Sequence, residues 1–237
     1  METRGHTSRD FEAELTDVRD RLVAMGTQVD GVLEASGRAL VARDIPLAKL
    51  IILTDRKTDS MELEIDHRCL DVLARRQPVA GDLRLLTSAL KMVVDLERVG
   101  DLGVSIAARV VELGREPPVI PYDDLLTMLT AARQMVPQAL ASLVAQDVAR
   151  ANQVIANDDV VDAQYARIFQ EIVEGMRQQD PPTIARAMRV QAIAKYVERI
   201  GDHATNIAER VIFVLTGNQV RHQGRVRRTD LSQPRED

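Results

Sequence analysis

The chain has 237 residues, enough for one large domain or for two domains of roughly 100–120 residues each. Its formal net charge of −5 gives no overall electrostatic reason to expect nucleic acid as a partner, and its single cysteine, Cys69, excludes an internal disulfide and a cysteine-based zinc site. The first residues lack the pattern of a secretory signal, and charges interrupt every apolar stretch, which predicts a soluble cytoplasmic protein. We expect Cys69 to be a small core residue.

The first predicted helix is long and amphipathic. Its apolar residues recur in alternating steps of four and three from Phe11 to Val32, which indicates one face packed in a helical bundle. We expect this helix to end near Ala42. The next residues, Asp44-Ile45-Pro46, offer an N-cap followed by a proline in the first turn of a new helix.

The second and third predicted helices are separated by a short turn. The seam of the second helix runs from Leu47 to Val72 and includes Thr54 and Thr58 among its apolar residues. Residues 77–82, Gln-Pro-Val-Ala-Gly-Asp, are typical of a turn, and Asp82 is the expected N-cap of the third helix. That helix is predicted to stop at Gly114.

A proline-rich segment, residues 114–121, is the best candidate for a boundary, because the helical rhythm begins again after it at Tyr122. Pro137 lies inside the new pattern, so we predict a helix with a bend there. A further helix is predicted over about residues 147–178. Asp180-Pro181-Pro182 then opens a last helix, and the arginine-rich residues after Gly217 are predicted to be disordered.

The two halves of the chain repeat one pattern. Residues 94–101 read VDLERVGD and residues 195–202 read KYVERIGD, an offset of 101 residues. Upstream, Asp44 and Ile65 recur as Asp147 and Ile168 at an offset of 103, so the change in length falls in a turn. We therefore predict an all-α fold of two tandem three-helix bundles, residues 10–116 and 121–217, with a polar tail over residues 218–237.

Each predicted unit carries two carboxylate pairs at i, i+4 spacing on neighbouring helices. The eight residues are Asp55, Asp59, Glu97 and Asp101 in the first unit and Asp158, Asp162, Glu198 and Asp202 in the second. One interpretation is a solvated face neutralised by Arg98 and Arg199. However, Glu97 lies at the border of an apolar face, where gathered carboxylates need a cation to offset repulsion and desolvation. Oxygen ligands favour Mg²⁺, Mn²⁺, Ca²⁺ or iron over zinc, so we predict sites for such metal ions.

The two predicted sites are not equal. Glu62 and Asp66 extend the carboxylate stripe of the first unit, whereas the second unit has Tyr165 and Phe169 in the corresponding positions. His203 follows Asp202 and could supply a nitrogen ligand, although an exposed or capping role is an equal alternative because its counterpart is a leucine.

Two glycines stand inside helices at repeated positions. Gly100 and Gly201 each cost about 1 kcal/mol relative to alanine in a helix. Their recurrence predicts the close approach of a backbone, a ligand or a neighbouring helix at both places.

The duplicated E-R-[IV]-G-D motif, the turn Gln77-Pro78-Val79-Ala80-Gly81-Asp82-Leu83-Arg84 and residues 198–209, ERIGDHATNIAE, resemble the PhoU family of phosphate-signalling regulators. The resemblance covers about Phe11 to Leu215. It implies a six-helix up-down arrangement and a cytoplasmic, often dimeric adaptor. Its partners would be the ATPase subunit of the phosphate ABC transporter and a membrane sensor histidine kinase, with contact to the membrane only through them. Such an adaptor damps the phosphate-starvation response when phosphate is plentiful.

The resemblance also bears on the metal sites. Some PhoU-like proteins bind multinuclear metal clusters, which makes Glu97, Asp101, Glu198 and Asp202 the first ligands to consider, supported by the aspartates of the preceding helix in each unit. Ser105 stands where the second unit has Asn206, which predicts weaker metal binding in the first unit.

Two other classes of protein are alternatives to such an adaptor. A di-metal carboxylate enzyme of ferritin-like type needs Glu-x-x-His motifs on two helices, but Gly100 and Gly201 occupy the positions three residues after Glu97 and Glu198. A purely structural bundle, with its carboxylates as surface charges, is the other alternative. We expect no catalytic residues.

Overall fold

A computed structural model of the chain describes residues 3–53, 56–114, 116–176 and 180–220, with side chains from residue 9 onward. Over these residues the chain forms seven helices and no strands. They are α1 (Thr3–Ala42), α2 (Ile45–Leu53), α3 (Arg56–Arg76), α4 (Ala80–Leu113), α5 (Asp123–Ala145), α6 (Val148–Gly175) and α7 (Pro181–Thr216). The prediction of an all-α helical bundle is confirmed. Most of the predicted tail, residues 221–237, lies outside the described residues.

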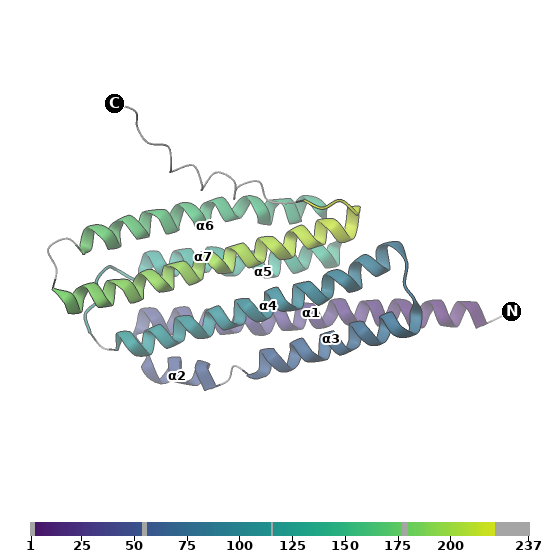
Figure 1. The fold of residues 1–237 in the computed structure, drawn as a ribbon, viewed down its shortest axis with the longest axis horizontal. Helices are drawn as coiled ribbons and strands as arrows, with labels where there is room; N and C mark the ends of the chain where they lie inside the picture. Colours follow the sequence, from purple (N-terminus) through teal and green to yellow (C-terminus); the bar gives the residue numbers. More distant parts are fainter. Residues whose placement is uncertain (1–2, 54–55, 115, 177–179, 221–237) are drawn as a thin grey trace, which may run out of the picture.

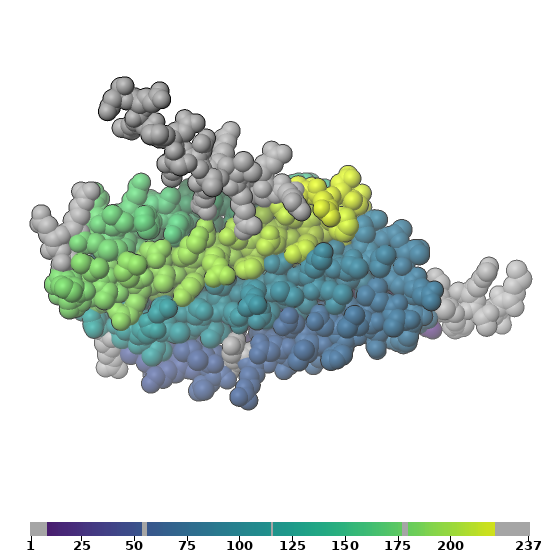
Figure 2. All heavy atoms as spheres, in the orientation of Figure 1, coloured from purple at the N-terminus to yellow at the C-terminus, as the bar shows by residue number. Residues whose placement is uncertain are grey.

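The long helices lie side by side along the length of the molecule (Figure 1). Helix α4 packs against α1, α2, α3 and α7, and α7 packs against α4, α5 and α6. Helices α4 and α7 therefore join the N-terminal group of helices to the C-terminal group, and a contact of α1 with α5 closes the bundle behind them. In Figure 2, α7, α4 and α3 follow one another across the visible face.

Several helix ends lie where cap residues and prolines predicted them. Asp44 accepts a hydrogen bond from the backbone N–H of Leu47 at 3.0 Å, and Pro46 lies in the first turn of α2. Asp180 accepts from the N–H of Thr183 before Pro181 opens α7. Helix α7 ends at Thr216, and its C-cap is Gly217, whose φ of 77° is readily adopted by glycine.

Three local predictions differ from the structure or are refined by it. The second predicted helix is described as two elements, α2 and α3, and residues 54 and 55 between them lie outside the described residues. Asp82 is not a cap, because α4 already begins at Ala80 and places Asp82 in the first turn, where its charge suits the helix dipole. Helix α5 runs continuously through Pro137.

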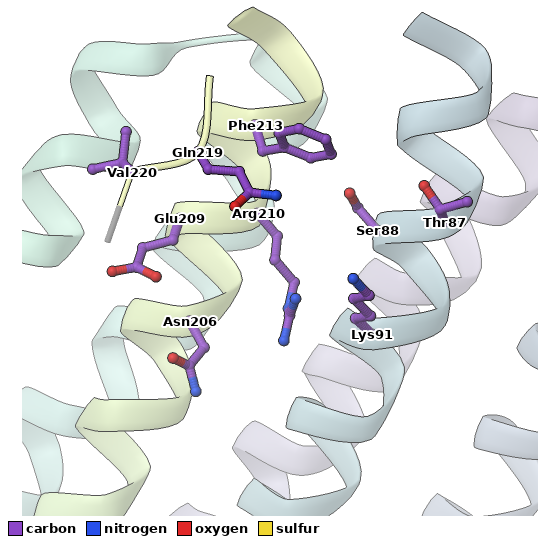
Figure 3. Close-up of a pocket in the computed structure, with 9 residues that line it drawn as sticks. All are labelled: Thr87, Ser88, Lys91, Asn206, Glu209, Arg210, Phe213, Gln219 and Val220. Carbon is purple, nitrogen blue, oxygen red and sulfur yellow. The ribbon is translucent and has the colours of Figure 1, made fainter. Parts of the chain in front are cut away.

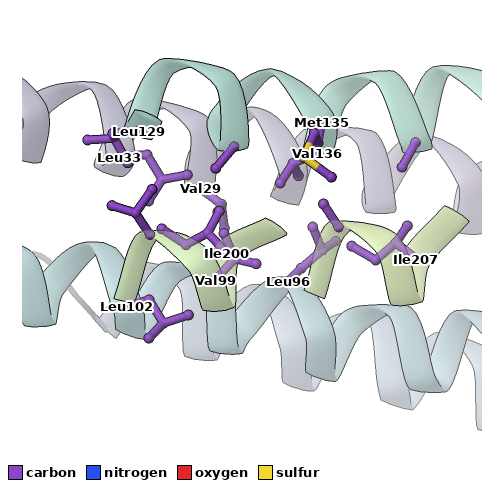
Figure 4. Close-up of a cluster of buried hydrophobic side chains, with 14 of the residues drawn as sticks. Val29, Leu33, Leu96, Val99, Leu102, Leu129, Met135, Val136, Ile200 and Ile207 are labelled. Atoms are coloured by element: carbon purple, nitrogen blue, oxygen red, sulfur yellow. The ribbon is translucent and has the colours of Figure 1, made fainter. Parts of the chain in front are cut away.

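The buried apolar side chains form one connected core. Figure 4 shows its centre, where Val29 of α1, Leu96 and Val99 of α4, Val136 of α5 and Ile200 of α7 meet. Burying each such side chain is worth roughly 1.5–3 kcal/mol. Within the described residues no helix has the length and apolar character needed to cross a membrane.

Cys69 lies in this core. Burial raises the pKa of its thiol to about 12, with a smaller contribution from the charge of Asp66. The thiol therefore stays protonated and packs as a small apolar group, as expected from its sequence context.

Candidate functional site

The first carboxylate cluster lies where α3 and α4 face each other. Asp59, Glu62 and Asp66 are on α3, and Glu97 and Asp101 are on α4; Asp55 lies outside the described residues. The Glu97 side chain is only 16% exposed. Burial, followed by the charge of Asp101, raises the pKa of Glu97 to about 7. Burial, and then the charges of Asp66 and Asp59, also raise the pKa of Glu62. These carboxylates share one electrostatic environment in which full ionisation is unfavourable.

Arg98 partly neutralises this cluster. Its guanidinium lies 3.4 Å from the Glu97 carboxylate and 3.5 Å from that of Asp101. The Arg98 side chain is 56% exposed, so solvent weakens both contacts. The described carboxylates of this cluster therefore outnumber the positive charge that Arg98 supplies. A hard cation bound among them would offset the excess negative charge.

The second carboxylate cluster lies between α6 and α7 and is more deeply buried. Glu198 is 1% exposed and Asp158 is also buried, while Asp162 and Asp202 are partly exposed. Glu198 forms an ion pair with Lys195, one turn earlier on α7. The ammonium of Lys195 also lies 5.3 Å from the centre of the Tyr165 ring. This cluster thus has a built-in cation at a position where the first unit has Val94.

The two clusters therefore differ in charge for a reason the sequence only partly indicated. Glu62 and Asp66 of the first cluster correspond to Tyr165 and Phe169, whose rings lie 6.2 Å apart. The aromatic pair replaces two charges, and Lys195 adds an opposite one. Charge alone favours added cations at the first cluster.

The two repeated glycines mark places where a neighbouring helix comes close. A Cβ atom on Gly201 would lie 2.8 Å from Oδ1 of Asp158, and one on Gly100 would lie 3.2 Å from the side chain of Thr58. Of the three predicted causes, the structure shows the neighbouring helix in both cases. At Gly201 the missing side chain makes room for one of the predicted metal ligands.

Across the described residues, no group of three or more His, Cys, Asp or Glu side chains is arranged to hold a metal ion. The donor atoms are nevertheless of the type that hard cations prefer, since all are carboxylate oxygens at the edge of the core. The predicted ligands are thus brought together in two clusters, Asp55 excepted, without being closed around one point.

A buried polar network between α4 and α7 was not predicted. Asp95 of α4 is buried and lies 2.9 Å from Nδ1 of His203. It also accepts hydrogen bonds from Nδ2 of Asn206 at 3.3 Å and Nε of Arg210 at 3.1 Å. Because an ionised carboxylate only accepts, Nδ1 of His203 donates to Asp95 in the tautomer that carries the ring proton on that nitrogen. The signal in the sequence was a lone carboxylate in register with the buried residues Met92 and Val99.

This network bears on two expectations. The ring of His203 is only 18% exposed and faces Asp95 across the α4–α7 interface, so the exposed or capping alternative is wrong, and the alternative of a nitrogen ligand stays a prediction. The amide of Asn206 faces Asp95 as well. The weaker metal binding expected of the first unit from Ser105 stays a prediction, and in the second unit the Asn206 amide is engaged in the interface.

The same interface has a second polar contact at the repeat-related positions. The offset of 101 residues relates Asp95 to Tyr196 and Arg210 to Arg109. Arg109 donates to the hydroxyl of Tyr196 at 3.4 Å, and it pairs with Glu112, which Arg189 of α7 also approaches at 3.4 Å. A buried carboxylate thus occupies one end of the interface, and a tyrosine occupies the related position.

Comparison with known families gives a match to the PhoU domain over two segments, residues 22–110 and 125–211. The chain is 39% identical over 225 residues to the phosphate-specific transport system accessory protein PhoU homolog of Pseudomonas aeruginosa, covering 94% of this chain and 92% of the relative. The homolog of the same name from Aquifex aeolicus is 36% identical over 210 residues, covering 89% and 95%.

Solved structures agree with these relatives. The crystal structure of PhoU from Pseudomonas aeruginosa superposes with a TM-score of 0.83 at 38% identity and covers 88% of this chain and all of that one. The phosphate transport system regulatory protein PhoU from Streptococcus pneumoniae superposes with the same TM-score at 26% identity, covering 90% and 100%.

Proposed function

The chain belongs to the PhoU family, and from that premise we propose that it regulates phosphate uptake and the phosphate-starvation response as a cytoplasmic adaptor. The observation that carries this proposal is the likeness to phosphate transport accessory proteins along nearly the whole chain, in sequence and in fold. Its partners would be the ATPase subunit of a phosphate ABC transporter and a sensor histidine kinase. Its role would be negative regulation when phosphate is plentiful, and its working form a homodimer.

We further propose that metal ions tune this adaptor. The ligands would be Glu97 and Asp101 with Asp55 and Asp59 in one cluster, and Glu198 and Asp202 with Asp158 and Asp162 in the other. Support comes from the raised pKa of Glu97, caused first by burial and then by the charge of Asp101, because both make full ionisation of the first cluster unfavourable. A divalent cation would supply the missing positive charge and hold α3 against α4. No catalytic role is proposed for any of these residues.

The adaptor role is tested by co-purification from phosphate-replete cells, with and without chelator. The tagged chain should retain the transporter ATPase subunit and the kinase. Loss of either on chelation would support metal-dependent contacts, whereas retention of neither partner from untreated cells would contradict the adaptor role.

The metal sites are tested separately by elemental analysis and thermal unfolding of the purified chain. If Mg²⁺ or Mn²⁺ binds only the folded state, a concentration of 100 times Kd raises the free energy of unfolding by about 2.7 kcal/mol. The double variants Glu97→Gln/Asp101→Asn and Glu198→Gln/Asp202→Asn should each lose part of this gain. The control, Glu171→Gln/Glu174→Gln, changes two exposed acids of α6 and should keep it. No metal content and no gain in any form would favour the structural bundle.

A further inference from the structure

A pocket of about 260 Å³ lies between α4 and α7, next to the Asp95 network, and none of the predicted metal ligands lines it (Figure 3). Side chains of both helices line it, and Gln219 and Val220, which follow α7, close one side. Its volume is below the roughly 300–1,000 Å³ typical of sites for drug-sized ligands. It therefore suits a small ligand, and the chemistry of its lining shows which kind.

Ser88 presents an unused hydroxyl to this pocket. The residue is 3% exposed, and its oxygen points from α4 toward α7 in Figure 3. The neighbouring Thr87 hydroxyl donates to the carbonyl of Leu83, but the Ser88 hydroxyl has no hydrogen-bond partner among the described residues. Its oxygen is not among the described buried atoms that lack a partner, so solvent reaches it from the pocket, and a ligand oxygen would replace that solvent as its hydrogen-bond partner.

Two cationic side chains lie beside Ser88. Lys91 is one turn along α4, and within the described part of the chain its ammonium makes no ion pair. Arg210 reaches in from α7, where the bond from its Nε to Asp95 fixes the guanidinium in place. In Figure 3 the guanidinium lies between Asn206 and Lys91. Only the Nε–H group of Arg210 donates to Asp95, so the terminal N–H groups of its guanidinium remain as further donors.

The acidic groups near the pocket do not compensate both positive charges of Lys91 and Arg210. Asp95 compensates Arg210, which leaves the charge of Lys91. Glu209 also lines the pocket, but Figure 3 shows its carboxylate directed away from Lys91 and Arg210. The donors thus converge from α4 and α7 on one side.

At the repeat-related position of the α4–α7 interface, the charged side chains pair with each other. The offset of 101 residues relates Ser88 to Arg189, Lys91 to Ala192 and Phe213 to Glu112. There Arg189 and Glu112 approach each other at 3.4 Å and compensate one another within the chain. At the Ser88 end no such internal pair fills the position among the described residues. The positive charge there is available to a ligand.

We propose that this pocket, lined by Ser88, Lys91 and Arg210, binds a phosphoryl group, as inorganic phosphate or as a small phosphate monoester. A tetrahedral oxyanion matches a set of converging hydroxyl, ammonium and guanidinium donors. Phe213 gives the pocket an apolar wall against which the organic part of a monoester would rest. This proposal is independent of the adaptor role, since it concerns only binding by the isolated chain.

The test is isothermal titration calorimetry of the full chain, freed of metal with chelator, against inorganic phosphate and, separately, glycerol 3-phosphate. Removing metal prevents the carboxylate clusters from recruiting phosphate through a bound ion. We expect saturable one-to-one binding of at least one of the two. The tighter ligand identifies the source of the phosphoryl group.

Two variants and one control locate the site. Lys91→Gln should weaken binding about tenfold or more, and Ser88→Ala about three- to tenfold. Both are small changes, so melting curves should match the parent chain. Lys49→Gln removes an exposed lysine on α2 and should leave Kd unchanged. Absence of saturable binding by either ligand would overturn the proposal, as would an unchanged Kd in both pocket variants. Neither result would affect the co-purification test of the adaptor role.

Discussion

Asp95 shows how one buried carboxylate can organise an interface between long helices. It receives three hydrogen bonds from α7, and one of its donors, Arg210, also lines the neighbouring pocket. Removing the acceptor leaves three donors without their shared partner, among them the guanidinium of Arg210, whose side chain is 31% exposed, and this costs more than the loss of one hydrogen bond.

We expect Asp95→Ala to lower the free energy of unfolding by about 2–4 kcal/mol, measured by urea denaturation. Arg98→Ala is the matched control, because it removes ion pairs of a mostly exposed residue on the same helix and should cost about 0–1 kcal/mol. Equal losses in the two variants would contradict the importance given to the Asp95 network.

The network also marks a limit of sequence reasoning at this scale. The partners of Asp95 are 108 to 115 residues away in the chain, so no local spacing links them. The carboxylate pairs, in contrast, were found because i, i+4 spacing on a helix is a local rule that the repeat doubles. Their clustering could be predicted, but the role of Lys195 depended on how α6 and α7 pack.

At the scale of elements, helix ends were predictable where residue chemistry dictates them. Asp44, Asp180 and Gly217 each act through a cap or a backbone conformation that few other residues adopt as well. The seam from Leu47 to Val72 predicted one helix where α2 and α3 are described, because its spacing stays in phase and no glycine or proline lies between the two elements. Periodicity reports which face is buried, and it does not report whether the helix is continuous.

Glycines inside helices provide a prediction at this scale. A Cβ atom on Gly31 of α1 would meet nothing within 4 Å, so Gly31→Ala should raise the free energy of unfolding by about 0.5–1 kcal/mol through helix propensity. On Gly103 of α4 the same atom would lie 2.9 Å from Val32 and 3.1 Å from Leu33. Gly103→Ala should therefore lower the free energy of unfolding by about 1–3 kcal/mol. Thermal unfolding of both variants checks the expected opposite signs.

At the scale of the whole molecule, the two predicted units share a core. Side chains of α1, α4, α5 and α7 meet at its centre, and α4 packs directly on α7 (Figure 4). The division into residues 10–116 and 121–217 stays a prediction about sequence organisation. Because the core is shared, unfolding of one group of helices would expose apolar side chains of the other group to solvent.

We therefore expect one cooperative unfolding transition, with calorimetric and van't Hoff enthalpies in agreement. Ile200→Ala, which truncates a fully buried side chain at the centre of the core, should shift that whole transition and cost about 2–5 kcal/mol. Two resolved transitions, with only one of them moved by Ile200→Ala, would show that the groups of helices unfold independently.

The unlike ends of the α4–α7 interface carry a consequence for ancestry. Where one half contributes Asp95, the other contributes Tyr196, and where one has Ser105 the other has Asn206. Two copies of the N-terminal half would face Asp95 with Arg109 but without the histidine and the asparagine that now satisfy it. Two copies of the C-terminal half would have no carboxylate to receive Arg210. The two halves of the chain are complementary rather than identical at the α4–α7 interface, so a second copy of either half could not replace the other half there.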